Sequence, residues 1–111
     1  MRPRRIITLV AVVAAATALL AGAALGVTKS VGVKQSGSKW HFTPSTLTIK
    51  KGDTVKWSWS GNTPHNVTGP GFASKTATKE TYKHRFTKKG TFRVICTIHV
   101  NKGQKMTIKV T

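Results

Sequence analysis

Cys96 and His99 stand three positions apart, at the two ends of the segment Cys-Thr-Ile-His, and both could bind a metal ion. A thiolate and a neutral imidazole suit copper or zinc, but a mononuclear site needs at least one more strong donor. His65 offers that donor, because Pro64 stiffens the loop before it and biases the neighbouring backbone away from helix. The sequence therefore predicts a metal site made of two histidines and one cysteine.

Cys96 is the only cysteine of the 111-residue chain. Alone it would be interpreted as a buried structural thiol or as half of an intermolecular bridge. The two histidines at suitable positions favour a metal ligand instead. His41 and His84 have no comparable neighbours, and we expect both to have structural roles, with His41 facing solvent between inward Trp40 and Phe42.

Short segments of alternating character must position these donors. Val55, Trp57 and Trp59 fall on one face of a strand, because strand side chains alternate. The same alternation recurs at residues 92–96 and 106–110, in shorter form at 47–49 and 82–86, and two further strands are expected at 28–34 and 39–42. Residues 61–64 and 69–74 are predicted to be loops. The pattern predicts an all-β sandwich of about seven or eight strands.

Residues 1–26 have the features of a signal peptide, with three arginines followed by a long apolar run. A run of this length also leaves open an uncleaved membrane anchor. The metal-binding domain is then residues 27–111, and we expect it outside the cytoplasm, in a periplasm, at the cell surface or secreted. This domain has 16 lysines and arginines against two acids, Asp53 and Glu80, a formal charge of +14 (16 minus 2).

The order and spacing of several segments resemble the cupredoxins, in particular the plastocyanin-like blue copper proteins. The segments are Phe42-Thr43-Pro44, Leu47-Thr48-Ile49, Gly52-Asp53-Thr54-Val55-Lys56-Trp57, Pro64-His65-Asn66-Val67, Tyr82 to Phe86, Gly90-Thr91-Phe92 and Cys96-Thr97-Ile98-His99. The resemblance implies an eight-stranded Greek-key sandwich that holds one type 1 copper ion, cycling between Cu(I) and Cu(II), at one end. His65, Cys96 and His99 match the ligand positions of the family, and two histidines with a cysteine are the trigonal set of blue-copper sites.

The fourth, axial ligand departs from the usual pattern of the family. The resemblance places a methionine five positions after the second histidine, where this chain has Gln104. Glutamine is a recognised weak axial donor through its amide oxygen. Met106 remains an alternative, because a buckled loop would let it reach the metal and it shares the parity of Gln104. The Gln104 hypothesis predicts the lower reduction potential, since a harder oxygen donor favours Cu(II).

The resemblance also implies a function: single-electron transfer between redox partners, without enzymatic activity. The ring edge of His99 would lie near the surface as the site of electron exchange, surrounded by Pro64, Ile98 and Val100. Asn66 would brace the two ligand loops. The basic surface is expected to attract a redox partner with an acidic surface or an anionic membrane, and the chain is expected to act as a monomer.

Two other functions stay open at the level of sequence. The first keeps the metal and makes the protein an extracytoplasmic copper carrier or buffer. The second, from a different class, is a lysine-rich β domain that binds a polyanion without metal. Nucleic acid is not expected, because the export signal argues against it and the tryptophans alternate inward rather than forming an exposed stacking surface.

Overall fold

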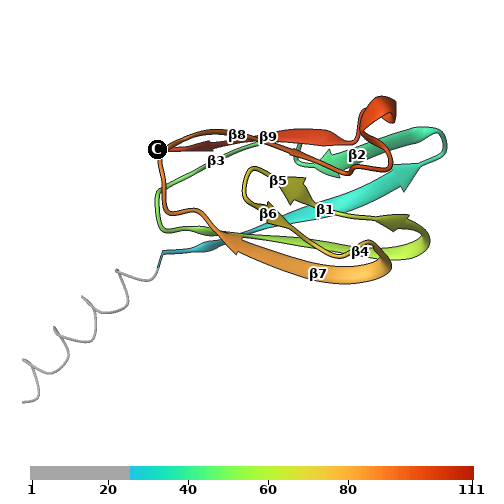
Figure 1. Cartoon of the computed structure of the whole chain (residues 1–111), viewed down its shortest axis with the longest axis horizontal. Coiled ribbons are helices and arrows are strands. Elements are labelled where there is room, and N and C mark those ends of the chain that lie inside the picture. The colour runs from blue at the N-terminus through green and yellow to red at the C-terminus, as the bar shows by residue number, and fades with distance from the viewer. Residues whose placement is uncertain (1–25) are drawn as a thin grey trace, which may run out of the picture.

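The computed structural model describes residues 26–111, which form a two-layered β-sandwich (Figure 1). Nine strands and one 3-10 turn lie in this range. They are β1 (Thr28–Ser36), β2 (Lys39–Thr43), β3 (Thr46–Ile49), β4 (Thr54–His65), β5 (Thr68–Gly69), β6 (Phe72–Ala73), β7 (Ala77–Arg85), β8 (Gly90–Ile95), η1 (Val100–Lys102) and β9 (Lys105–Val110). The predicted all-β sandwich is confirmed, and the two-residue strands β5 and β6 account for the larger number of strands.

The two sheets have the strand orders β2-β1-β4-β7 and β3-β9-β8-β5-β6. Two pairs are parallel, β1 with β4 and β3 with β9, and the other pairs are antiparallel. The turn η1 lies at the end of the sandwich opposite the C-terminus (Figure 1). Loops from both sheets can therefore meet at the end where η1 lies.

The core lies between the sheets and follows the predicted alternation. In β4, Val55, Trp57 and Trp59 are buried, and in β9 Met106, Ile108 and Val110 are buried. The two sheets are also joined by a buried contact in which Trp57 Nε1 donates to Met106 Sδ at 3.4 Å. This interior gives the domain a rigid body on which the site is mounted.

Two of the predicted loops are wrong in detail. Residues 61–64 belong to β4, which continues to His65 through a bulge between Ser60 and His65. A bulge adds unpaired residues to one strand and bends it, so Gly, Asn and Pro are tolerated within a strand. Residues 69–74 include the short hairpin of β5 and β6.

The predicted signal peptide, residues 1–26, lies outside the described residues except for Gly26. Within residues 26–111 no helix has the length and apolar character needed to cross a bilayer. The described domain thus begins just before β1.

Candidate metal centre

His65 is the buried last residue of β4, after the register shift between Ser60 and His65. Its ring is 5% exposed. Burial is the main reason that the pKa of His65 is lowered, and the neighbouring His99 lowers it further. A lowered pKa keeps the imidazole neutral, which is the form that binds metals.

The segment from Cys96 to Gln104 is a closed loop that holds the other donors. Backbone bonds run from Cys96 N to Gln104 O (3.1 Å), from His99 N to Cys96 O (3.2 Å) and from Gln104 N to His99 O (3.2 Å). Gly103 adopts φ 94°, in the left-handed region, where η1 ends. These backbone bonds fix the spacing between Cys96 and His99.

The structure brings the three predicted donors together at one point. Cys96 Sγ lies 3.5 Å from His99 Nδ1, and the donor atoms of Cys96, His99 and His65 all lie within 4.8 Å of one another. Cys96 is fully buried and His99 is 6% exposed. One sulfur and two imidazole nitrogens converge among buried residues, and this donor set suits copper.

Gln104 completes this cluster and is itself fully buried. Its Oε1 lies 2.9 Å from His65 Nδ1 and 3.1 Å from His99 Nδ1. Its Nε2 donates to the carbonyl oxygens of Lys34 (3.1 Å) and His41 (3.2 Å). Because only the amide nitrogen can donate to two carbonyls, the oxygen must face the histidines.

Met106, the alternative axial donor, is the second residue of β9, two positions after Gln104. It is 2% exposed, and its sulfur accepts the hydrogen bond from Trp57 Nε1. Its strand partner is Val94, within the core. Met106 is therefore held between the sheets, whereas Gln104 contacts both histidines.

Asn66 joins the two segments that carry the donors. Its Nδ2 donates to Thr97 Oγ1 (2.8 Å) and Thr76 Oγ1 (3.0 Å), and its Oδ1 accepts from Thr97 N (3.0 Å) and Thr68 Oγ1 (3.0 Å). The residue after His65 is thus tied to the residue after Cys96. This is the bracing contact that the sequence predicts for Asn66.

Trp40 is the site residue that the sequence did not reveal. Its ring stacks on His99, with centroids 3.7 Å apart and planes 23° apart, and its centroid lies 6.0 Å from that of His65, with the planes at 63°. The alternation of Trp40 with Phe42 predicted that Trp40 points inward, and it does. An inward position alone does not tell whether a side chain belongs to the hydrophobic core or to the metal site. No sequence signal separated the two cases, because the closeness of β2 to the ligand loop appears only in the assembled fold.

The remaining histidines lie outside the cluster, as expected. His84 stacks on Phe72 at 4.0 Å, and burial lowers its pKa. His41 is half-buried, less exposed than predicted, and supplies its backbone carbonyl to Gln104. Neither side chain belongs to the group of donors that could hold a metal.

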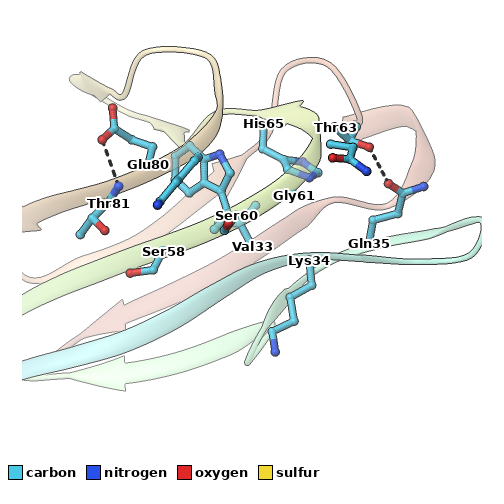
Figure 2. Close-up of a pocket in the computed structure, with 13 residues that line it drawn as sticks. Val33, Lys34, Gln35, Ser58, Ser60, Gly61, Thr63, His65, Glu80 and Thr81 are labelled. Carbon is cyan, nitrogen blue, oxygen red and sulfur yellow. Dashed lines mark hydrogen bonds between the residues drawn. The ribbon is translucent and has the colours of Figure 1, made fainter.

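A groove of about 1030 Å³ opens beside His65 and is lined by β1, β4 and β7 (Figure 2). Parallel pairing of β1 with β4 ends at Gly32 and Ser58. Beyond that point Thr63 Oγ1 donates to Gln35 Oε1 at 2.9 Å (Figure 2). Glu80, the one carboxylate in the lining, is paired with Lys75 at 3.3 Å. The groove therefore offers no unpaired carboxylate next to His65.

Comparisons with known proteins agree on one family. Residues 28–111 match the sequence profile described as copper binding proteins, plastocyanin/azurin family. A plastocyanin from Scenedesmus fuscus is 34% identical, with 62% of this chain and 85% of that protein covered. Oxidised plastocyanin from Dryopteris crassirhizoma has a TM-score of 0.63 at 21% identity and is covered completely by 75% of this chain. A methionine-to-glutamine mutant of amicyanin in the Cu(I) state has a TM-score of 0.63 at 28% identity, with 76% of this chain and 82% of that chain covered.

Proposed function

The chain belongs to the plastocyanin/azurin family of copper-binding proteins, and on that premise we propose that His65, Cys96 and His99 hold its copper, with Gln104 as a weak fourth donor. The protein is a plastocyanin-like electron carrier with a type 1 copper site. Carriers of this family are not enzymes. The observation that carries the ligand assignment is the convergence of one thiol sulfur and two imidazole nitrogens within 4.8 Å.

Bound copper supplies the ability to accept and release one electron. The residues of the chain would hold the donor atoms in the same positions in both oxidation states. The loop from Cys96 to Gln104 is closed by its own backbone bonds, and Asn66 ties it to the segment after His65. A site that cannot rearrange changes little on electron transfer, and small rearrangement favours fast transfer.

Gln104 is the better supported axial donor. Its amide oxygen is directed at both histidines by the two hydrogen bonds of its amide nitrogen, whereas the sulfur of Met106 is engaged with Trp57. The amicyanin relative, a methionine-to-glutamine mutant in the Cu(I) state, supports the compatibility of glutamine with this fold. An oxygen donor favours Cu(II) relative to a thioether. The protein should therefore have a low potential for its family.

The family implies that the partners are redox proteins. The charge of +14 on residues 27–111 favours partners with an acidic surface, or work near an anionic membrane. We further propose that residues 1–26 are an export signal and that residues 27–111 act as a monomer outside the cytoplasm. Cleavage of the signal would be visible as a lower mass of the mature protein.

Copper(II) titration of the purified domain, followed by visible absorption, tests the assignment. We expect an intense thiolate-to-copper charge-transfer band that saturates at one equivalent. Cys96→Ser should abolish the band, and His84→Gln, a change at a histidine outside the cluster, should leave it intact. A band of equal intensity in the Cys96→Ser variant, or no binding by the parent chain, would contradict the proposed site.

A further inference from the structure

Trp40 covers the face of a proposed copper ligand and reaches further toward solvent than that ligand. The indole ring lies 3.7 Å from the His99 ring between centroids, nearly parallel to it. His99 is 6% exposed, whereas Trp40 is half-buried. Trp40 lies on β2, which is an edge strand of its sheet. The stacked pair thus forms a continuous aromatic connection from the metal site toward the surface.

The indole N–H of Trp40 is free to bind an external acceptor. Buried tryptophans usually place this N–H on a partner, and the other two tryptophans do so: Trp57 Nε1 donates to Met106 Sδ, and Trp59 Nε1 donates to the Ala77 carbonyl at 2.7 Å. Trp40 Nε1 donates to no acceptor among residues 26–111. A half-buried aromatic residue with a free donor is typical of interface anchors.

A cation lies over the ring that carries this free donor. Lys102 Nζ is 6.0 Å from the centroid of the Trp40 ring. Lys102 comes from η1, between His99 and Gln104, so the cation is attached to the ligand loop itself. An indole donor and an ammonium at the same aromatic ring match a carboxylate, which accepts hydrogen bonds only.

We propose that the redox partner docks on Trp40, with an acidic group of the partner at the indole N–H and Lys102, and that the electron crosses through the stacked rings of Trp40 and His99. This proposal rests on the proposed copper ligation. One electron passes from the reduced partner, which is thereby oxidised, to the metal, which changes from Cu(II) to Cu(I); the reverse step delivers it to an oxidised partner. The indole itself is neither oxidised nor reduced.

Ile98 marks the competing route. The family resemblance places electron exchange at the edge of His99, among Pro64, Ile98 and Val100. Ile98 is 47% exposed and is next to His99 in the chain. Its aliphatic side chain has no free donor, so it can offer a partner only apolar contact. Substitution of Trp40 and of Ile98 therefore separates the two routes.

The first test uses the copper-loaded chain in its Cu(I) form and hexacyanoferrate(III), an anionic one-electron oxidant. The variants are Trp40→Leu, which removes the stacked ring and the donor, Trp40→Phe, which keeps a stacked ring without the donor, and Ile98→Ala. We expect Trp40→Leu to slow oxidation by about tenfold or more, Trp40→Phe to slow it less, and Ile98→Ala to change it by less than about twofold. The proposal would be overturned if Ile98→Ala slowed the oxidation strongly while Trp40→Phe and Trp40→Leu left its rate unchanged.

A second readout does not depend on electron transfer. Hexacyanochromate(III), a paramagnetic anion, should broaden the indole N–H resonance of Trp40 in the Cu(I) protein well before those of Trp57 and Trp59. Broadening centred on Ile98, or spread evenly over the basic surface, would contradict docking at Trp40. Absence of the visible band in the copper(II) parent chain would instead remove the proposed function, so the two failures are distinguishable.

Discussion

At the scale of single residues, the proposed axial donor Gln104 would distinguish this copper site from one with a methionine donor. Its oxygen faces both histidines at 2.9 and 3.1 Å. Gln104→Met replaces this oxygen with a thioether, which favours Cu(I). We expect the reduction potential to rise by more than about 60 mV, a factor of ten in the one-electron equilibrium constant. Cyclic voltammetry of the copper-loaded variant measures this shift.

Met106→Leu is the matched control for that measurement. The sulfur of Met106 accepts a hydrogen bond from Trp57 in the core. We therefore expect Met106→Leu to lower the stability of the fold and to leave the reduction potential nearly unchanged. A potential that moves with Met106→Leu and stays fixed in Gln104→Met would make Met106 the axial donor. The two variants thus choose between the alternatives that the sequence left open.

Residue types and spacing were sufficient to predict the cluster of His65, Cys96 and His99, because thiol and imidazole side chains are strongly tied to metal chemistry. Gln104 came only from the family resemblance, with Met106 left open beside it. Residue types and spacing were not sufficient for Trp40. An alternating strand predicts that Trp40 points inward, but the interior of a sandwich includes both its core and the lining of a site at its end. Whether Trp40 belongs to the core or to the site depends on where β2 lies relative to the ligand loop. That arrangement is a property of the assembled fold.

Asn66 acts at the scale of elements, because it joins the end of β4 to the loop after β8. It makes four hydrogen bonds, two of them to Thr97. Asn66→Ala leaves several of these polar groups unpaired, and we expect a loss of about 1–3 kcal/mol in the free energy of unfolding. Copper should also dissociate faster. Urea unfolding of the copper-free chain and chelator-driven copper release measure the two effects.

Asn62→Ala provides the control, since Asn62 is exposed in the bulged part of β4. It should change stability by less than about 0.5 kcal/mol, as is usual for surface positions. Equal effects of the two substitutions would show that Asn66 does not hold the elements together.

Asp53 connects the turn before β4 to the start of the domain. Its carboxylate accepts the backbone N–H groups of Lys50 and Val27, each at 3.0 Å, and these bonds hold the pKa of Asp53 below its usual value. A depressed native pKa stabilises the fold above the unfolded pKa of about 3.9 and ceases to do so as the pH falls toward the native value. The copper-free domain should therefore lose stability as the pH falls below about 5 and through the native pKa of Asp53.

Thermal unfolding across this pH range tests the role of Asp53. We expect Asp53→Asn to be less stable near neutral pH and to lose less stability on acidification than the parent chain. A decline of the same steepness in both proteins would assign the acid sensitivity to other groups.

The elements themselves were largely predictable, because β4 and β9 alternate over their buried lengths and their turns contain glycine. The error at residues 61–64 has a physical reason. Gly61 and Pro64 disfavour regular pairing, yet a bulge lets the strand pass through them and end at His65. The local composition thus predicted that the strand would end before residue 61. The pairing with β7 on both sides of the bulge shows that the strand continues to His65.

At the scale of the whole molecule, the charge of the described residues has almost no internal compensation. The carboxylate of Asp53 is buried and accepts hydrogen bonds from backbone N–H groups, so it neutralises no lysine or arginine directly. Glu80 is paired with Lys75. We expect oxidation of the Cu(I) protein by hexacyanoferrate(III) to slow by about tenfold or more when salt screens the field. A cationic oxidant should instead react faster with added salt.

The location of the effective charges can be tested with two variants of equal net charge. Lys102 lies beside Trp40, whereas Lys56 lies in β4 opposite Lys83 of β7. We expect Lys102→Gln to slow the reaction with hexacyanoferrate(III) more than Lys56→Gln does. Equal effects would mean that net charge alone steers the anion.

The central claim is tested most directly by X-ray absorption at the copper edge, recorded on the same copper-loaded protein in its Cu(II) and Cu(I) forms. We predict one short sulfur and two imidazole nitrogens in both states, with closely similar distances and no loss of a ligand on reduction. A coordination shell without sulfur, or one that gains or loses a strong ligand between the two states, would contradict the account of a one-copper electron carrier.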